Sequence, residues 1–151
     1  MTYGSQQFFD ELKERLNKDE RFRSLGKDAY TATELIYIKD LRVGIWQNTA
    51  DGEISELKLI PRREIDQYLQ RAELVYYVED YDSMVKISLG EESFVSLVIQ
   101  DAIVFKGPMK KLSKIQAPSE RMETLLREMT KNVVVPSRIQ YQKWLHENGY
   151  L

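Results

Sequence analysis

The chain has 151 residues, of which 42% are hydrophobic and 30% charged, and this balance is typical of one folded globular domain. It contains no cysteine and a single histidine, which excludes disulfides, thiolate metal sites, cysteine nucleophiles and multi-histidine metal sites. The formal net charge of −2 argues against nucleic acid as an obligatory partner.

The first 26 residues predict two helices. Ser5 is placed to cap a helix in which the apolar side chains share one face: Phe8, Phe9, Leu12 and Leu16. A second short helix is expected to start at Asp19 and to end at Gly26, because glycine favours the left-handed backbone found at many helix ends.

Three strands are predicted next. β-Branched and aromatic residues dominate residues 33–39, which indicates a strand. A tight connection at Asp40-Leu41 leads to a second strand that contains Trp46. The Asp51-Gly52 pair predicts a hairpin turn, followed by a third strand over residues 54–60. Three consecutive antiparallel strands form a meander.

The middle of the chain alternates between helix and strand. Pro61 suits the start of a helix, and the apolar run Leu74–Val78 is typical of a strand at the centre of a sheet. Asp82 is expected to cap a short helix that ends at Gly90. A further helix carries apolar residues at the spacing of a buried stripe: Phe94, Leu97 and Val98.

Residues 102–105 predict the last strand, and three helices follow it. They are expected to begin at Pro108, at Ser119 as a capping residue, and at Pro136-Ser137. No linker divides the chain, so residues 1–151 are predicted to form one domain. The fold class is α+β, with a five-stranded, mostly antiparallel sheet that is covered by helices on one side.

Few residues suggest catalysis. The glycines form no phosphate-binding loop, no serine arrangement resembles a nucleophile elbow, and His146 is interpreted as a surface residue. The acidic group Glu79, Asp80 and Asp82 follows a predicted strand, where carboxylates can bind a divalent cation or act as an acid/base pair. Helix capping and a solvated turn explain the same residues, so an enzyme built on them is kept as an alternative.

The apolar runs are too short to span a bilayer, and the sequence does not open with a basic-then-apolar leader, so a cytoplasmic location is expected. Charge is uneven along the chain. Residues 1–105 carry 13 basic and 20 acidic groups, whereas residues 106–151 carry 9 and 4. The basic segment is either the solvated face of helices or a docking face for anionic lipid head groups or an acidic partner.

A family resemblance is carried by the second half of the chain. The pattern is a strand, an acidic cap, a short helix closing on glycine, a second apolar helix, and a strand that ends in glycine before another helix. The matching segments are Glu73–Gly90, Phe94–Gln100, Ala102–Gly107 and Met109–Leu112. This pattern resembles the C-terminal half of the sterol carrier protein 2 (SCP2-like) family.

The upstream meander, with Trp46 and the Asp51-Gly52 turn, is similar to the sheet of the same family. The resemblance covers residues 33–116, and residues 117–151 are expected to be a C-terminal helical extension of the same domain. The sequence departs from the family at Asp101-Ala102, where a glycine commonly enters the last strand.

The resemblance implies a non-catalytic domain that binds or transfers a hydrophobic ligand in an apolar tunnel, without cofactor, metal or catalytic residues. The ligand classes are fatty acyl chains, acyl-CoA, sterols and isoprenoid lipids. The residues expected to line the tunnel are Trp46, Met84, Phe94, Leu97, Val98, Phe105, Met109 and Leu112. Lys110 and Lys111 are expected to contact a ligand head group.

Methionine is unbranched and adapts to irregular apolar spaces, and four of the five methionines lie in the second half of the chain. The same apolar side chains can instead simply fill a core. Two partner interactions stay open beside the ligand: transient contact with a membrane surface, and a homodimer whose interface is formed by the apolar helix faces.

Overall fold

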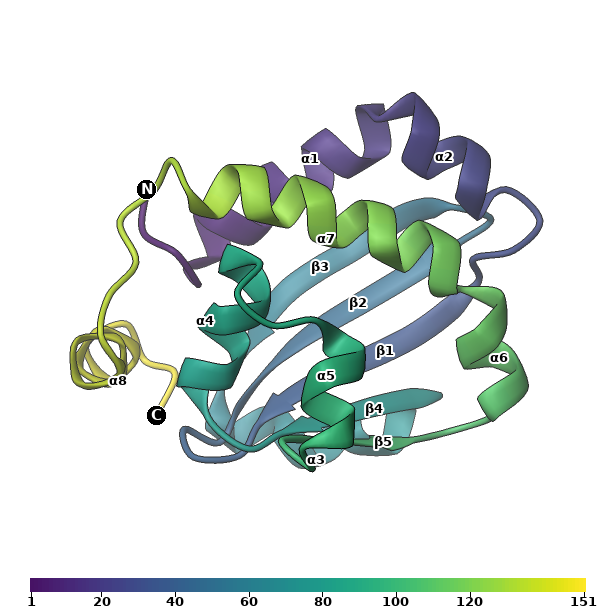
Figure 1. The fold of residues 1–151 in the computed structure, drawn as a ribbon. Coiled ribbons are helices and arrows are strands. Elements are labelled where there is room, and N and C mark those ends of the chain that lie inside the picture. Colours follow the sequence, from purple (N-terminus) through teal and green to yellow (C-terminus); the bar gives the residue numbers. More distant parts are fainter.

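A five-stranded sheet is the centre of the computed structural model, which describes residues 1–151 (Figure 1). The strands lie in the order β3-β2-β1-β4-β5, and all neighbouring pairs are antiparallel except β1 and β4. Their bounds are Ala32–Ile38 for β1, Val43–Ala50 for β2, Glu53–Ile60 for β3, Leu74–Val78 for β4 and Ile103–Lys106 for β5. The predicted meander and the mostly antiparallel α+β sheet are confirmed.

The turn between β2 and β3 has the backbone that its sequence predicts. Ala50 pairs with Glu53, and the two residues between them, Asp51 and Gly52, have φ values of 49° and 77°. Positive φ at both central positions is typical of a type I′ hairpin turn, which matches the right-handed twist of the strands. The aspartate-glycine pair therefore sets the register of the hairpin.

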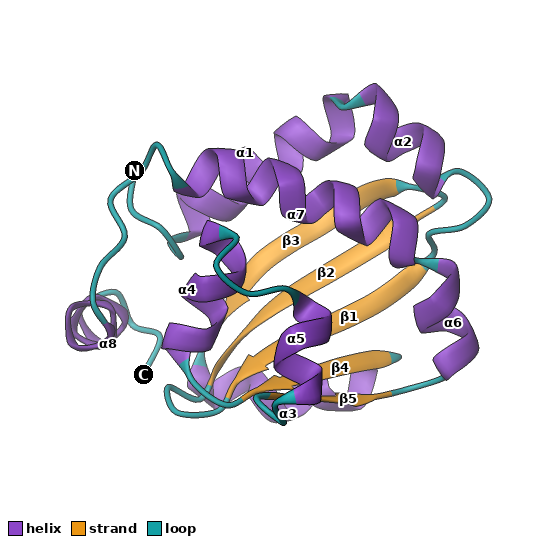
Figure 2. Ribbon diagram, viewed as in Figure 1, coloured by secondary structure: helices purple, strands orange, loops and turns teal.

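Helices lie on both faces of the sheet, whereas the sequence led us to expect them on one side (Figure 2). One face carries six helices: α1 (Gln6–Lys18), α2 (Glu20–Gly26), α4 (Tyr81–Leu89), α5 (Phe94–Ile99), α6 (Met109–Lys114) and α7 (Gln116–Thr130). The opposite face carries α3 (Ile65–Arg71), which follows the 3-10 turn η1 (Arg62–Glu64). A last helix, α8 (Arg138–Glu147), lies beside the two chain termini.

The second face needs a cover because side chains alternate along a strand. On β1 and β2 the paired residues Leu35 and Trp46 point away from the main core. Together with Ile60, Ile65 and Tyr68 they form a separate buried cluster beneath α3. The connection from β3 to β4 therefore crosses this face and brings β4 parallel to β1.

Two predicted helix starts are wrong. Asp80, not Asp82, caps α4, because its Oδ1 accepts a hydrogen bond from the Ser83 backbone N–H at 2.7 Å. Ser119 lies inside α7, where its backbone N–H donates to the carbonyl of Ile115. The helix begins earlier, at Gln116, and Pro118 is tolerated there because the first turn of a helix needs no intrahelical N–H donor.

Helix α7, the first part of the predicted C-terminal extension, is part of the main helix layer. α7 packs against α1, α2 and α4, and its buried side chains include Leu125, Leu126 and Met129. These residues belong to the same apolar cluster as the inward faces of α1 and β1.

The outer edge of β3 is occupied by two side-chain amides of α1. Gln6 binds the Leu57 carbonyl and the Leu59 N–H, at 3.1 and 2.9 Å. Asn17 binds both the carbonyl and the N–H of Ile54, at 2.8 and 2.9 Å. These amides replace the hydrogen bonds of a sixth strand, which protects this edge from pairing with another chain. The opposite edge of the sheet, β5, has no neighbouring strand.

An ion pair joins α2 to α7 and yields a stability prediction. Asp19 caps α2 by accepting from the Phe22 N–H at 2.8 Å, and its two oxygens accept from Arg121 at 2.9 and 3.0 Å. The hydrogen bond from Arg121 holds the pKa of Asp19 below its usual value. Asp19→Ala should therefore lower the free energy of unfolding at pH 7 by about 1–2 kcal/mol through the lost cap alone.

The pH dependence of this effect has a definite sign. A carboxyl whose pKa is lower in the folded state stabilises the fold above its unfolded pKa of about 3.9, and this contribution is lost as the pH falls through the folded value. The difference between wild type and Asp19→Ala, measured by urea unfolding, should narrow from pH 7 to pH 3. Asp66→Ala, at an exposed site of α3, is the control and should change stability by less than about 0.5 kcal/mol. A pH-independent difference would contradict the ionic part of the argument.

Candidate functional site

The structure brings half of the predicted ligand-binding residues together. Met84 and Leu97 are buried in the main core, with 8% and 2% of their surface exposed. Phe94 and Phe105 are half-buried and pack against the same cluster. These four residues come from α4, α5 and β5; α4 contacts β4, and α5 contacts the edge strand β5 (Figure 1).

Trp46 is not part of this group. It lies in the cluster beneath α3, on the opposite face of the sheet, where its ring contacts Tyr68 edge to face at 5.0 Å between centroids. The guanidinium of Arg71 lies over the same ring at 4.9 Å, and the indole N–H donates to Glu56 at 3.3 Å. The five strands therefore separate Trp46 from the other predicted residues.

The remaining predicted residues lie at or near the surface. Val98 is 36% exposed and Met109 is 65% exposed, while Leu112 is half-buried. Of the two lysines, Lys110 is exposed, whereas the ammonium group of Lys111 binds the carboxylate of Glu73 at 2.5 Å. Only Lys110 therefore has a free ammonium group to offer to a ligand head group.

An aromatic group forms the surface of the sheet beside α5. The ring of Tyr76 on β4 lies 5.5 Å from Phe94 and 5.5 Å from Phe105, measured between ring centroids. All three residues are half-buried. Sequence reasoning named the two phenylalanines but not Tyr76.

Tyr76 also contacts a buried carboxyl group, Glu34 on β1. The Tyr76 hydroxyl donates to Glu34 Oε1 at 2.7 Å, and the Tyr30 hydroxyl donates to Glu34 Oε2. Gln47 on β2 extends this network by donating to the Tyr30 oxygen at 2.9 Å and to Thr49 at 3.0 Å. Glu34 is only 5% exposed. We refer to these five residues as the Glu34 network.

Burial governs the ionisation of the Glu34 network. Loss of solvent raises the pKa of Glu34 above its usual value, and the two phenolic hydrogen bonds oppose that rise only in part. Burial likewise raises the pKa of Tyr30 and of Tyr76, and the nearby Glu34 charge adds to both shifts. The phenols therefore remain neutral donors.

Sequence reasoning missed Glu34, although the strand pattern contains a signal for it. Residues of β1 alternate between the two faces, and Ile36 and Ile38 point into the main core. Glu34 is two residues before Ile36 and therefore lies on the same face of the strand, so the alternation places a carboxyl group on an apolar face. A charged residue at an inward position is rare in ordinary cores and favours a functional role.

The acidic triplet after β4 does not form a metal site. Asp80 is used to cap α4, and Asp82 is exposed on the first turn of that helix. No group of three or more histidine, cysteine, aspartate or glutamate side chains converges anywhere in the structure in a way that would hold a metal ion.

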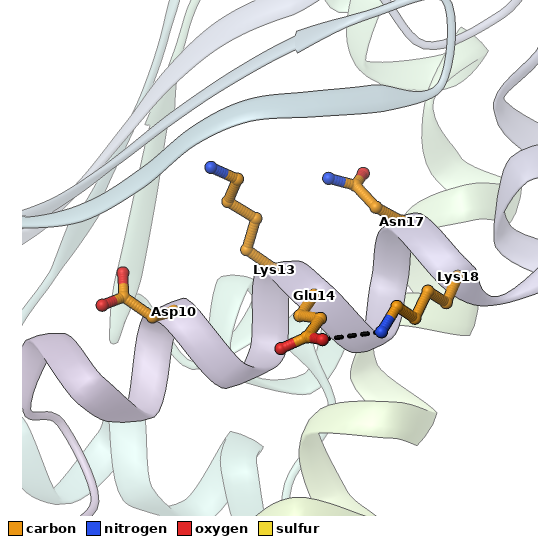
Figure 3. Close-up of a pocket in the computed structure, with 5 residues that line it drawn as sticks. All are labelled: Asp10, Lys13, Glu14, Asn17 and Lys18. Carbon is orange, nitrogen blue, oxygen red and sulfur yellow. Dashed lines mark hydrogen bonds and ion pairs between the residues drawn. The ribbon is translucent and has the colours of Figure 1, made fainter.

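Two open surface hollows are polar or mixed in character and lie away from the predicted residues. One, of about 370 Å³, lies along α1 and is lined by Asp10, Lys13, Glu14, Asn17 and Lys18, with Lys18 bound to Glu14 at 2.6 Å (Figure 3). The other, of about 420 Å³, lies between the N-terminal segment and the end of α8. Neither contains a predicted ligand-binding residue. No helix has the length and apolar character needed to span a bilayer.

The backbone is unusual at Asp101-Ala102, where the sequence departs from the SCP2-like pattern. Asp101 has a φ of 60°, in the left-handed region that favours glycine. Ala102 is buried next to it and continues into β5. The turn into the last strand is therefore made without glycine, because aspartate tolerates this conformation better than most residues.

Comparison with solved structures places this arrangement among known folds. A crystal structure of sterol carrier protein 2 superimposes with a TM-score of 0.68 over 82% of this chain and 96% of that chain, at 14% sequence identity. The chain has the sterol carrier protein 2 fold. The resemblance noted in the sequence is thereby confirmed at the level of the fold.

Two further structures share the SCP2-like fold. A conserved hypothetical protein from Thermus thermophilus, described as a candidate sterol carrier protein, matches with a TM-score of 0.68 and 14% identity over 89% of this chain and 92% of its own. A ubiquinone synthesis protein, UbiJ-SCP2, matches with a TM-score of 0.52 and 8% identity over 77% of this chain and 92% of its own. No family model matches the sequence, and the comparison with curated proteins finds no significant match.

Proposed function

We propose that this SCP2-like domain binds or carries a hydrophobic ligand, without transforming it, in an apolar site between the sheet and the helix layer. The ligand classes are a fatty acyl chain, acyl-CoA, a sterol or an isoprenoid lipid. The observation that carries the proposal is the fold, which the chain shares with structures named as sterol carriers over most of its length.

The side chains on α4, α5, β5 and α6 support this proposal. Met84, Phe94, Leu97 and Phe105 form the proposed inner wall, and Val98, Met109 and Leu112 the proposed rim, with Lys110 near a head group. Each buried methylene group contributes roughly 0.8 kcal/mol, so a long alkyl chain gains useful affinity after the cost of ordering it. Such a site needs no catalytic group.

Ligand extraction tests the proposal. Purified protein is denatured in organic solvent, the extract is examined by mass spectrometry for a stoichiometric lipid, and the native mass is measured by light scattering. We expect a lipid from the wild type, less from Phe94→Asp, and an unchanged amount from Ile139→Asp, which alters a side chain on α8 that is 77% exposed. A wild type without lipid, which also fails to retain added lipid, would refute the carrier function.

A second candidate function is self-association through the edge strand β5. Five of the eight exposed large apolar residues lie on α5, β5 and the start of α6: Val95, Val98, Ile99, Val104 and Met109. Val104 on β5 is 50% exposed and no strand pairs with the outer edge of β5, so antiparallel pairing of two copies would supply the missing hydrogen bonds and bury apolar surface. The same light-scattering measurement separates the candidates, because a dimer without lipid favours the interface and a lipid-bearing monomer favours the carrier.

A further inference from the structure

The Glu34 network places a carboxyl group in a layer that is otherwise filled by apolar side chains. Burying such a group costs free energy unless it is well paired, and an apolar side chain of similar volume often serves the core as well or better. Glu34 forms no ion pair with a lysine or an arginine. Lys111 is close enough for its charge to lower the pKa of Glu34, but its ammonium group is bound to Glu73.

The carboxyl group also has unused hydrogen-bonding capacity. Each of its oxygens accepts one phenolic hydrogen bond, from Tyr76 and from Tyr30. An ionised carboxylate can accept about four. Glu34 therefore offers acceptor positions that the protein itself leaves free.

The position of the network joins these free acceptors to the proposed ligand site. Tyr76 bridges Glu34 to the rings of Phe94 and Phe105, which belong to the proposed inner wall. These three residues are half-buried, whereas Glu34, which Tyr76 contacts, is almost fully buried. An alkyl chain that enters with a small polar end first and packs against the rings brings that end to Glu34, whereas a large head group such as that of acyl-CoA stays at the rim near Lys110.

We propose that Glu34 binds the polar end of the ligand and selects a lipid alcohol over a fatty acid anion. This inference rests on the proposed carrier function and specifies its ligand class. A hydroxyl group donates a hydrogen bond to a free Glu34 lone pair, and its transfer out of water costs less free energy than that of a charged group. A carboxylate brings a second negative charge into a site of low polarity, and an ammonium group loses far more hydration than a hydroxyl group.

Competition between two lipids of equal chain length tests this selection. Full-length protein, delipidated under native conditions, is incubated at pH 8 with equimolar 1-hexadecanol and hexadecanoate, re-isolated, and analysed by mass spectrometry for the bound ratio. A charge-assisted hydrogen bond should favour the alcohol by about 10- to 100-fold in the wild type. Glu34→Gln, which keeps the size of the side chain, should bring the ratio to within about threefold of one.

Two further variants separate selection from general damage. Glu91→Gln removes an exposed carboxylate next to the end of α4 and should leave the wild-type ratio unchanged. Tyr76→Phe frees the Glu34 oxygen that Tyr76 occupies, so it should raise the preference for the alcohol, in the opposite direction from Glu34→Gln. A purely structural role for Glu34 would move both variants the same way.

The outcomes distinguish this inference from the proposed function. Retention of both lipids in equal amounts by the wild type, or an alcohol preference that persists in Glu34→Gln, overturns the inference and leaves the carrier function in place. Retention of neither lipid by the wild type and by Glu91→Gln overturns both.

Discussion

Replacing Tyr141 with alanine should lower the free energy of unfolding by about 3–5 kcal/mol, the range for removing a large buried aromatic side chain. Tyr141 is 2% exposed and stacks on Tyr81 at 4.7 Å and on Trp144 at 5.9 Å between ring centroids. Its hydroxyl donates to the Gly4 carbonyl at 2.7 Å. The variant therefore loses apolar burial, two stacked contacts and the link between α8 and the N-terminal segment.

Chemical unfolding monitored by circular dichroism measures this loss of stability. One further variant isolates the contribution of the hydroxyl group, and another serves as the control. Tyr141→Phe removes only the hydroxyl group and should cost about 0.5–1.5 kcal/mol, the typical value of one hydrogen bond. Ile139→Ala, on the exposed side of the same helix, should change stability by less than about 0.5 kcal/mol. A loss below about 1 kcal/mol for Tyr141→Ala would mean that α8 contributes little to the stability of the domain.

The parts of the fold that sequence reasoning predicted are those fixed by local chemistry. The Asp51-Gly52 turn needs only two residues that tolerate positive φ, and the flanking strands follow from side-chain type. Ser137 was likewise placed at the start of the last helix, where it forms a reciprocal capping box with Gln140. These signals act within a few residues, so one sequence is enough to find them.

The wrong predictions concern choices between neighbouring polar residues. Asp80 and Asp82 are both good caps, and the sequence alone gives no reason to prefer one. The structure favours Asp80 because the next N–H, that of Tyr81, is held by Asp40 at 3.1 Å, which fixes where the chain enters the helix. That contact joins residues 41 positions apart, beyond the reach of a local pattern.

The candidate site shows the same limit on a larger scale. The sequence identified Phe94 and Phe105 as apolar residues of one region, and packing on a shared sheet face brings them to Tyr76. It did not reveal that Tyr76 also reaches Glu34, because β1 and β4 become neighbours only through the crossover beneath the sheet. Alternation along the strands puts Trp46 and Glu34 on opposite faces of the sheet, but a local pattern does not tell which face the helices of the candidate site cover. Trp46 was misplaced for that reason.

Trp46 provides a second large expected effect, which bears on where the ligand lies. Trp46→Ala should lower the free energy of unfolding by about 3–5 kcal/mol, because the side chain is 1% exposed and anchors the cluster beneath α3. The contacts with Tyr68 and Arg71 are lost with the ring. In protein that remains folded, however, lipid retention should stay at the wild-type stoichiometry, since the sheet separates Trp46 from the proposed site.

Phe94→Ala is the matched variant on the other face. It also removes an aromatic ring, but from the half-buried group that contains Tyr76, so it should cost less stability and release more lipid. Urea unfolding and lipid extraction, measured on both variants at a temperature where each is folded, give the comparison. Loss of lipid from folded Trp46→Ala together with full retention by Phe94→Ala would place the ligand beneath α3 instead, since the two rings lie on opposite faces of the sheet.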